Sequence, residues 1–116
     1  MKYALLIYGP EQGWAEASQP EREKVYVQYR EFAQMLETRG AIRGGEELDL
    51  TSTATTVRHS GDDVMVTDGP FAETTEQLGG FFLIDAADLD EALGYAKALP
   101  ASCVEVRPVV ESSEPH

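Results

Sequence analysis

The chain has 116 residues, 42% of them hydrophobic and 26% charged, which suits one globular domain with its own core. Its formal net charge of −12 argues against nucleic acid or an anionic membrane as a partner, because both require a surplus of Lys and Arg. No apolar run approaches the roughly 18 residues of a membrane span. The single cysteine, Cys103, cannot form an internal disulfide, so a cytoplasmic protein is expected.

The first predicted strand covers residues 2–9, KYALLIYG, in which both alternating sets of side chains are apolar. That pattern indicates a strand buried on two faces. Residues 10–19 predict a loop that carries the single tryptophan, Trp14.

A long helix is predicted from a capping box at Ser18 and Glu21, with Pro20 in the first turn. Its apolar residues at helical spacing are Val25, Tyr29, Phe32 and Leu36. The helix is expected to end at Arg39, before Gly40.

The middle of the chain predicts a short strand at residues 41–50, interrupted by Gly44 and Gly45, and then a hairpin at residues 54–69. Valines at positions 57, 64 and 66 flank the hairpin turn, SGDD.

The C-terminal part begins with a second two-faced strand at residues 79–85, GGFFLID. A helix capped by Asp88 and Glu91 is predicted to run to Leu99. The residues expected on its buried face are Leu89, Ala92, Leu93 and Ala96. Residues 103–110, CVEVRPVV, alternate as the last strand.

This order of elements predicts an α+β, ferredoxin-like fold for residues 1–110, with both helices on one face of an antiparallel sheet. Residues 111–116 are expected to form a mobile C-terminal tail. The two-faced strands leave the second face of the sheet without a cover. A second copy of the sheet would supply one, giving a dimeric α/β-barrel. The alternative is that the long helix and the Trp14 loop wrap round the edge of the sheet.

Metal and nucleotide motifs are absent from the sequence. Two histidines and one cysteine cannot make a zinc or copper ligand set without carboxylates, and there is neither a Walker A nor a G-x-G-x-x-G sequence. No cofactor is therefore expected. His59 is interpreted as a solvated strand residue, and Cys103 as a small packed apolar residue.

One stretch, VTDGPFAETTEQLGGFFLID at residues 66–85, combines a Gly-Pro break, several carboxylates and a Gly-Gly pair. Asp68 and Glu73 are candidate general bases, and Glu73 and Glu76 would share a face on a helical turn. The candidate ligand-binding residues are Gly69, Pro70, Phe71, Glu76, Arg43 and Tyr8. The alternative interpretation is a rigid corner with solvated carboxylates.

That stretch resembles the YCII-related DGPF-domain family, as do the segments MKYALLIYG, GGEEL, DLDEALGYAKALP and VEVRPV. The resemblance covers essentially the whole chain, and the block D-G-P-F-x-E-x-x-E-Q-L-G-G-[FY] is specific. It implies a ferredoxin-like dimeric α/β-barrel, a bacterial origin, and genes that often neighbour or are fused to extracytoplasmic-function sigma factors. It implies no established reaction. More distant YCII proteins carry a His–Asp pair, and neither histidine of this chain matches it.

The resulting hypothesis is a homodimer that binds a small organic molecule in a cleft between helices and sheet, with carboxylate-based proton transfer as its chemistry if it is an enzyme. Arg43 or Arg107 would hold an anionic group, and Tyr3 or Tyr8 would line the cleft. The alternative is a non-enzymatic partner or ligand sensor associated with an extracytoplasmic-function sigma factor. A structural dimer without a ligand is the third interpretation.

Overall fold

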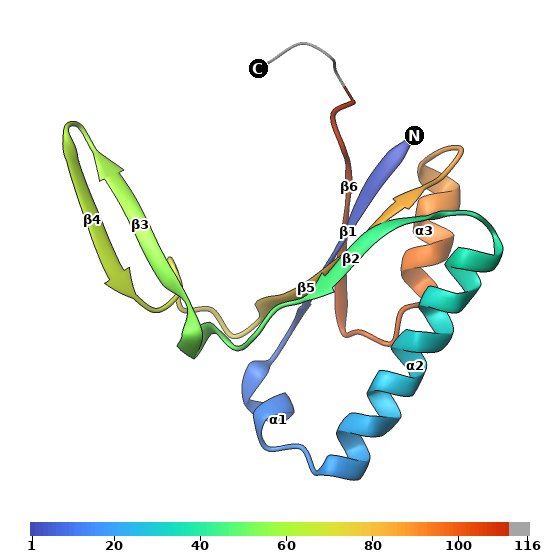
Figure 1. The fold of residues 1–116 in the computed structure, drawn as a ribbon, viewed down its shortest axis with the longest axis horizontal. Coiled ribbons are helices and arrows are strands. Elements are labelled where there is room, and N and C mark those ends of the chain that lie inside the picture. The colour runs from blue at the N-terminus through green and yellow to red at the C-terminus, as the bar shows by residue number, and fades with distance from the viewer. Residues whose placement is uncertain (112–116) are drawn as a thin grey trace.

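The computed structural model describes residues 1–111, so residues 112–116 of the predicted mobile tail lie outside the described part of the chain. A four-stranded antiparallel sheet forms the centre of the fold, and a separate two-stranded sheet projects from it (Figure 1). In chain order the elements are β1 (Lys2–Gly9), α1 (Glu11–Ala15), α2 (Gln19–Thr38), β2 (Ile42–Glu47), the 3₁₀ turn η1 (Thr51–Thr53), β3 (Thr55–Ser60), β4 (Asp63–Asp68), β5 (Gln77–Asp85), α3 (Leu89–Ala98) and β6 (Cys103–Pro108).

The main sheet has the strand order β2-β5-β1-β6, with every neighbouring pair antiparallel. This order interleaves the units β1-α2-β2 and β5-α3-β6, so the predicted α+β architecture with an antiparallel sheet is confirmed. Within one chain the sheet is open and not a closed barrel. Closure by a second copy stays a prediction.

Local capping explains where the long helix begins. The Ser18 side chain accepts a hydrogen bond of 3.2 Å from the backbone N–H of Glu21, and Pro20 lies in the first turn. The chain before this helix differs from the prediction, because residues 11–15 form the short helix α1 in place of a loop. The Arg22 guanidinium donates to the carbonyl oxygens of Trp14 and Ala15, which gives the end of α1 a fixed anchor on α2.

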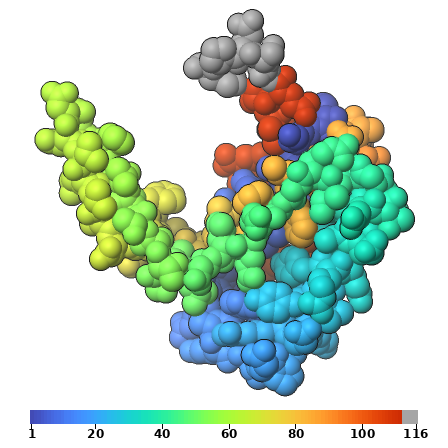
Figure 2. All heavy atoms as spheres, viewed as in Figure 1, coloured from blue at the N-terminus to red at the C-terminus, as the bar shows by residue number. Residues whose placement is uncertain are grey.

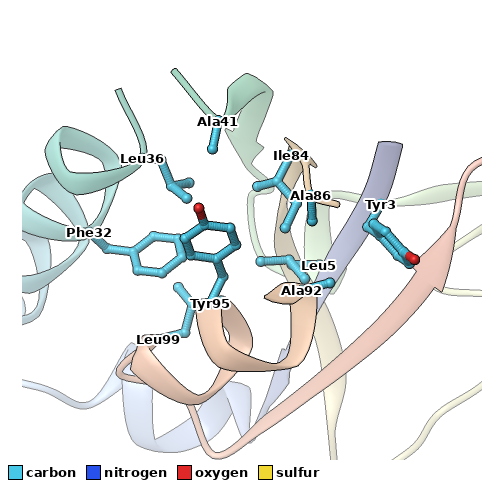
Figure 3. Close-up of a cluster of buried hydrophobic side chains, with 10 residues drawn as sticks. All are labelled: Tyr3, Leu5, Phe32, Leu36, Ala41, Ile84, Ala86, Ala92, Tyr95 and Leu99. Atoms are coloured by element: carbon cyan, nitrogen blue, oxygen red, sulfur yellow. The ribbon is translucent and has the colours of Figure 1, made fainter. Parts of the chain in front are cut away.

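The core lies between the sheet and the two longer helices (Figure 3). Its buried members are Tyr3, Leu5, Phe32, Leu36, Ala41, Ile84, Ala86, Ala92, Tyr95 and Leu99. In α3 the buried stripe follows Ala92, Tyr95 and Leu99 at helical spacing. The prediction that Leu89 belongs to the buried face was wrong: it is 49% exposed, because the first turn of α3 lies at the margin of the packed layer.

The opposite face of the sheet lacks a helical cover within residues 1–111, because α2 and α3 lie on the same side (Figure 1). Strand register places Leu6 beside Phe81 and Ala4 beside Leu83 on this uncovered face. The suggestion that the Trp14 loop wraps round to cover it was wrong, since Trp14 packs edge-on against Tyr26 of α2.

Strands β3 and β4 confirm the predicted hairpin and form an arm that projects from the body (Figures 1 and 2). The register pairs Val57 with Val66 and His59 with Val64, so three valines share one side of the arm. These valines are 54%, 57% and 65% exposed at positions 57, 64 and 66. His59 is exposed, as predicted.

Cys103 is exposed at the start of the outer strand β6, so its prediction as a packed residue was wrong. The register pairs it with Tyr8, which places it on the uncovered face of the sheet. The Cys103 side chain is therefore a free thiol that is accessible to solvent.

Candidate ligand-binding cleft

A cleft of about 590 Å³ opens between α1, the N-terminal half of α2, the sheet and the segment that follows α3. This volume is in the range of small-molecule sites, which are commonly clefts of roughly 300–1,000 Å³. The side chains that shape it include Trp14, Val25, Tyr26, Tyr29, Leu50 and Phe82. The predicted helical positions Val25 and Tyr29 are therefore cleft walls, whereas Phe32 and Leu36 farther along α2 are core.

Two glycines leave the floor of the cleft open. The register sets Gly45 beside Phe82 and Gly80 beside Glu47, on the face of the sheet that the helices cover. A Cβ atom at Gly80 would lie 2.9 Å from the Glu46 carbonyl oxygen, and one at Gly45 would lie 2.9 Å from the Phe81 carbonyl oxygen. Both positions therefore require glycine because neighbouring backbone approaches too closely for a side chain.

Aromatic rings brace the walls of the cleft. Trp14 and Tyr26 meet edge to face with ring centroids 5.5 Å apart, and Tyr29 stacks on Phe82 at 6.5 Å. The Arg22 guanidinium lies 5.5 Å from the centroid of the Trp14 ring. These contacts tie α1 to α2 and α2 to β5, so the apolar walls are held in place without a ligand.

Carboxylate and phenol groups supply the polar lining. The Tyr26 hydroxyl donates to the two carboxylate oxygens of Glu47 at 3.2 and 3.3 Å. Burial raises the pKa of Tyr26 and the negative charge of Glu47 adds to the rise; the same two causes, in the same order, raise the pKa of Tyr29. Both phenols are therefore neutral hydrogen-bonding groups at physiological pH.

The charged residues that border the cleft are all acidic: Glu11, Glu46 and Glu47. Glu46 contributes backbone, because the register pairs it with Phe81 and places its side chain on the uncovered face, so the carboxylates of the cleft are those of Glu11 and Glu47. Glu11 is already engaged, since its carboxylate accepts hydrogen bonds from the backbone N–H and the hydroxyl of Thr51. Glu47 lies at the exposed rim, within reach of a ligand and of water.

The predicted carboxylates lie away from this cleft. Asp68, Glu73 and Glu76 are all exposed, at the end of β4 and in the segment that follows it. The condition under which Glu73 and Glu76 would share a face, a helical turn, is not met, because residues 69–76 form bends and coil. The side-chain amide of Gln77 folds this segment by donating to two of its backbone carbonyls, those of Ala72 and Thr74.

The Asp-Gly-Pro-Phe block forms the base of the arm. Gly69 has a φ of +104°, a left-handed conformation that favours glycine, and its N–H donates to the Ala54 carbonyl at 2.7 Å. The Thr56 hydroxyl donates back to the Gly69 carbonyl at 2.7 Å. Phe71 is 74% exposed, and its carbonyl accepts a hydrogen bond from Arg58. These bonds fix the direction in which the arm leaves the body.

The same block borders a second hollow of about 610 Å³, to which Gly69, Pro70 and Glu73 contribute. Pro10, Glu11 and Gln77 border both this hollow and the cleft. Ligand binding by the block and catalysis by Asp68 or Glu73 stay predictions.

The two candidate arginines do not border the cleft. Arg43 donates to the carbonyl oxygens of Gly40 and Ile42 and lies 3.7 Å from an Asp85 carboxylate oxygen. Arg107 pairs with Glu105 at 3.2 Å. Their guanidinium groups are therefore engaged elsewhere, and neither is placed to hold an anionic group in the cleft.

Of the two candidate tyrosines, only Tyr8 borders the cleft. Tyr3 is buried in the core, away from the cleft. Tyr8 borders the cleft, but its hydroxyl donates to Glu105 at 3.2 Å on the uncovered side of the sheet. Burial, followed by this hydrogen bond, raises the pKa of Tyr8.

Sequence reasoning missed Trp14, Tyr26 and Glu47 as cleft residues. A usable signal was the i, i+4, i+7 spacing of Arg22, Tyr26 and Tyr29, which sets one aromatic and polar stripe on α2.

Within residues 1–111, no three side chains of His, Cys, Asp or Glu gather as a metal-binding group. Over the same described range, no helix has the length and apolar character needed to cross a membrane.

The fold and the cleft define an α+β protein with a ligand-sized aromatic cleft on the helical side of an open antiparallel sheet. Residues 1–113 match the YCII-related domain, and the chain belongs to that family. It is 40% identical over 114 residues to an uncharacterised protein, R00369, of Rhizobium meliloti (strain 1021), across 94% of this chain and 92% of the relative. The family expected from the Asp-Gly-Pro-Phe block is confirmed.

Proposed function

We propose that this protein is a homodimer that binds a small organic molecule in the cleft between α1, α2 and the sheet. The observation that carries the proposal is the cleft itself: about 590 Å³, with a floor kept open by Gly45 and Gly80. Its aromatic walls are braced by protein contacts, which lowers the cost of ordering them around a ligand.

Proton transfer is the reaction class proposed if the protein is an enzyme, with Asp68 or Glu73 as the base. Support comes from Glu73, which borders the hollow that shares Pro10, Glu11 and Gln77 with the cleft. A ligand that extends from the cleft across these shared residues would approach the Glu73 carboxylate.

The dimer part of the proposal is supported by two apolar surfaces. One is the uncovered sheet face with Leu6 and Phe81, and the other is the arm face formed by its three exposed valines. A two-stranded hairpin is marginally stable alone in water, and an exposed apolar side makes a cover favourable. The space between the arm and the body is open (Figure 2). A second copy would cover both surfaces in one two-fold contact.

A second candidate function is that of a non-enzymatic partner or ligand sensor associated with an extracytoplasmic-function sigma factor. The exposed arm valines favour it if they stay uncovered in the homodimer. The homodimer is preferred because it covers the sheet face as well as the arm.

Ligand binding is tested by thermal-shift screening of a small-molecule library that contains neutral, cationic and anionic aromatic compounds. A compound at 100 times its Kd stabilises the fold by about 2.7 kcal/mol, which raises the melting temperature by several degrees. Val25→Trp fills the cleft from α2, whereas Val27→Trp places the same indole at an exposed position two residues away. Hits are expected to bind wild type and Val27→Trp but not Val25→Trp. An absence of hits, or equal binding to Val25→Trp, would contradict the proposed site.

The dimer is tested by sedimentation velocity on the wild-type protein, Val66→Glu and Val27→Glu. Both substitutions add one charge at an exposed valine, but only Val66 lies on the arm. Wild type and Val27→Glu should sediment as dimers and Val66→Glu should shift toward monomer. A monomeric wild type would refute the dimer and leave the arm available to another protein.

A further inference from the structure

The charge of the cleft selects one class among small organic ligands. Among the described residues, those that border the cleft include no Lys, Arg or His, while Glu11 and Glu47 contribute two carboxylates. Arg22 is the cation beside the cleft wall, and it is held by the Trp14 and Ala15 carbonyls. An anionic ligand would therefore meet unfavourable charge, and the net charge of −12 on the whole chain adds to this repulsion.

Glu47 is the carboxylate best placed to receive a cation. Both carboxylate oxygens of Glu11 accept hydrogen bonds from Thr51. Among the described side-chain contacts, the carboxylate of Glu47 accepts hydrogen bonds only from the Tyr26 hydroxyl. Each carboxylate oxygen can accept more than one hydrogen bond, so an ammonium group can bind without displacing Tyr26. The hydroxyl also fixes the orientation of the carboxylate.

The surrounding rings suit the same ligand. Trp14, Tyr26 and Tyr29 gather at the part of the cleft that contains Glu47. Aromatic faces attract cations, most strongly where water is excluded, and their remaining surface packs against an apolar body. Neutral phenols add hydrogen-bond acceptors for an N–H donor.

We infer that the cleft takes a small organic cation: an amine on an apolar, aromatic-sized body, whose ammonium group is held by Glu47 beside the Tyr26 and Tyr29 phenols. This inference rests on the proposed ligand-binding function and names its ligand class. It replaces the anionic class expected when Arg43 and Arg107 were the candidate ligand-holding groups.

The test measures the affinity of one scaffold in three charge states at pH 7 by ligand-observed NMR: 2-phenylethylamine, 2-phenylethanol and 3-phenylpropanoate. The affinity of each hit from the thermal-shift screen is likewise compared with the affinities of its cationic, neutral and anionic analogues. The amine is expected to bind at least about tenfold more tightly than the alcohol, since a hydrogen bond to a charged group is lost. Added salt should weaken the binding of the amine, because Glu47 is at the exposed rim.

Two glutamate variants assign the effect to one side chain. Glu47→Gln removes a charge at the cleft, and Glu37→Gln removes one from the exposed last turn of α2. The affinity of the amine should fall about tenfold in Glu47→Gln and stay at the wild-type value in Glu37→Gln. The circular dichroism spectra and melting curves of both variants establish that the fold is intact.

Two kinds of failure are distinguishable. Neutral or anionic compounds that bind as well as their amines, or amines unaffected by Glu47→Gln, overturn the cationic class while leaving a ligand site. If no compound of any charge binds, the proposed function fails and the inference fails with it.

Discussion

Substitution of Gly80 by alanine probes the close approach between β2 and β5 that leaves the cleft floor open. The added Cβ would lie 2.9 Å from the Glu46 carbonyl oxygen, which belongs to the backbone and cannot rotate away. Strand β2 must then shift by a few tenths of an ångström, in a part of the sheet where Gly80 is buried. We therefore expect Gly80→Ala to destabilise the protein.

The size of the effect follows from two opposing contributions. Overpacking at a site with little room costs about 1–3 kcal/mol. Alanine also restricts the unfolded chain, which returns roughly 0.5–1 kcal/mol. The net loss is then roughly 0–2.5 kcal/mol with a central value of about 1.3 kcal/mol, and that central value corresponds to roughly 5–10 °C in melting temperature at 4–8 °C per kcal/mol.

Gly94→Ala is the matched control. Gly94 lies within α3, it is exposed, and a Cβ there meets no atom within 4 Å. Helix propensity then predicts stabilisation by about 0.5–1 kcal/mol. Urea unfolding followed by circular dichroism measures both variants at 25 °C. A Gly80→Ala protein as stable as the wild type would show that β2 can shift without loss of stability. The explanation that close backbone packing requires glycine at the cleft floor would then be wrong.

Three further predictions concern the helices and the cleft. Ser18→Ala removes the acceptor for the Glu21 N–H and should cost about 0.5–2 kcal/mol in urea unfolding, whereas no change would show that the cap does not stabilise α2. Leu36→Ala empties a fully buried site and should cost about 2–5 kcal/mol by the same measurement; a loss below 1 kcal/mol would contradict the packed core. Because the raised pKa of Tyr29 disfavours its ionisation in the folded protein, its stabilising contribution is complete below about pH 10, the unfolded value, and is lost as pH rises through the higher folded value. Tyr29→Phe should therefore lose less stability than the wild type between pH 9 and 11, and identical pH profiles would refute this coupling.

Several elements could be predicted from the amino-acid sequence because their signals are local. Ser18 and Glu21 predict the start of α2 because a helix cap joins residues that are three apart in the sequence. The SGDD turn locates the hairpin, and the register of β3 with β4 follows from it. The alternating apolar residues of β1 and β5 showed that both faces of the sheet are apolar, since side chains alternate along any strand. The Asp-Gly-Pro-Phe block identified the family.

Predictions from the sequence failed for two short segments. Residues 11–15 carry no strong helix pattern, and α1 forms where Arg22 of the next helix holds its last carbonyls. The spacing of Glu73 and Glu76 suits a helical turn, but Gln77 and the Gly-Pro pair fold that segment into bends. In the first case the deciding contact comes from another helix, and in the second it comes from Gln77, directly after the segment.

The position of the cleft and the residues that line it depend on contacts between segments that are distant in the chain. Gly45 and Gly80 are far apart in the chain, and the pairing of β2 with β5 brings both to one face. Tyr26 meets Glu47 because α2 passes over the end of β2, while Arg43 of the same strand is drawn to Asp85. Charges and glycines that look alike in the sequence therefore take different roles, because the register and the helix positions set which groups face the same space.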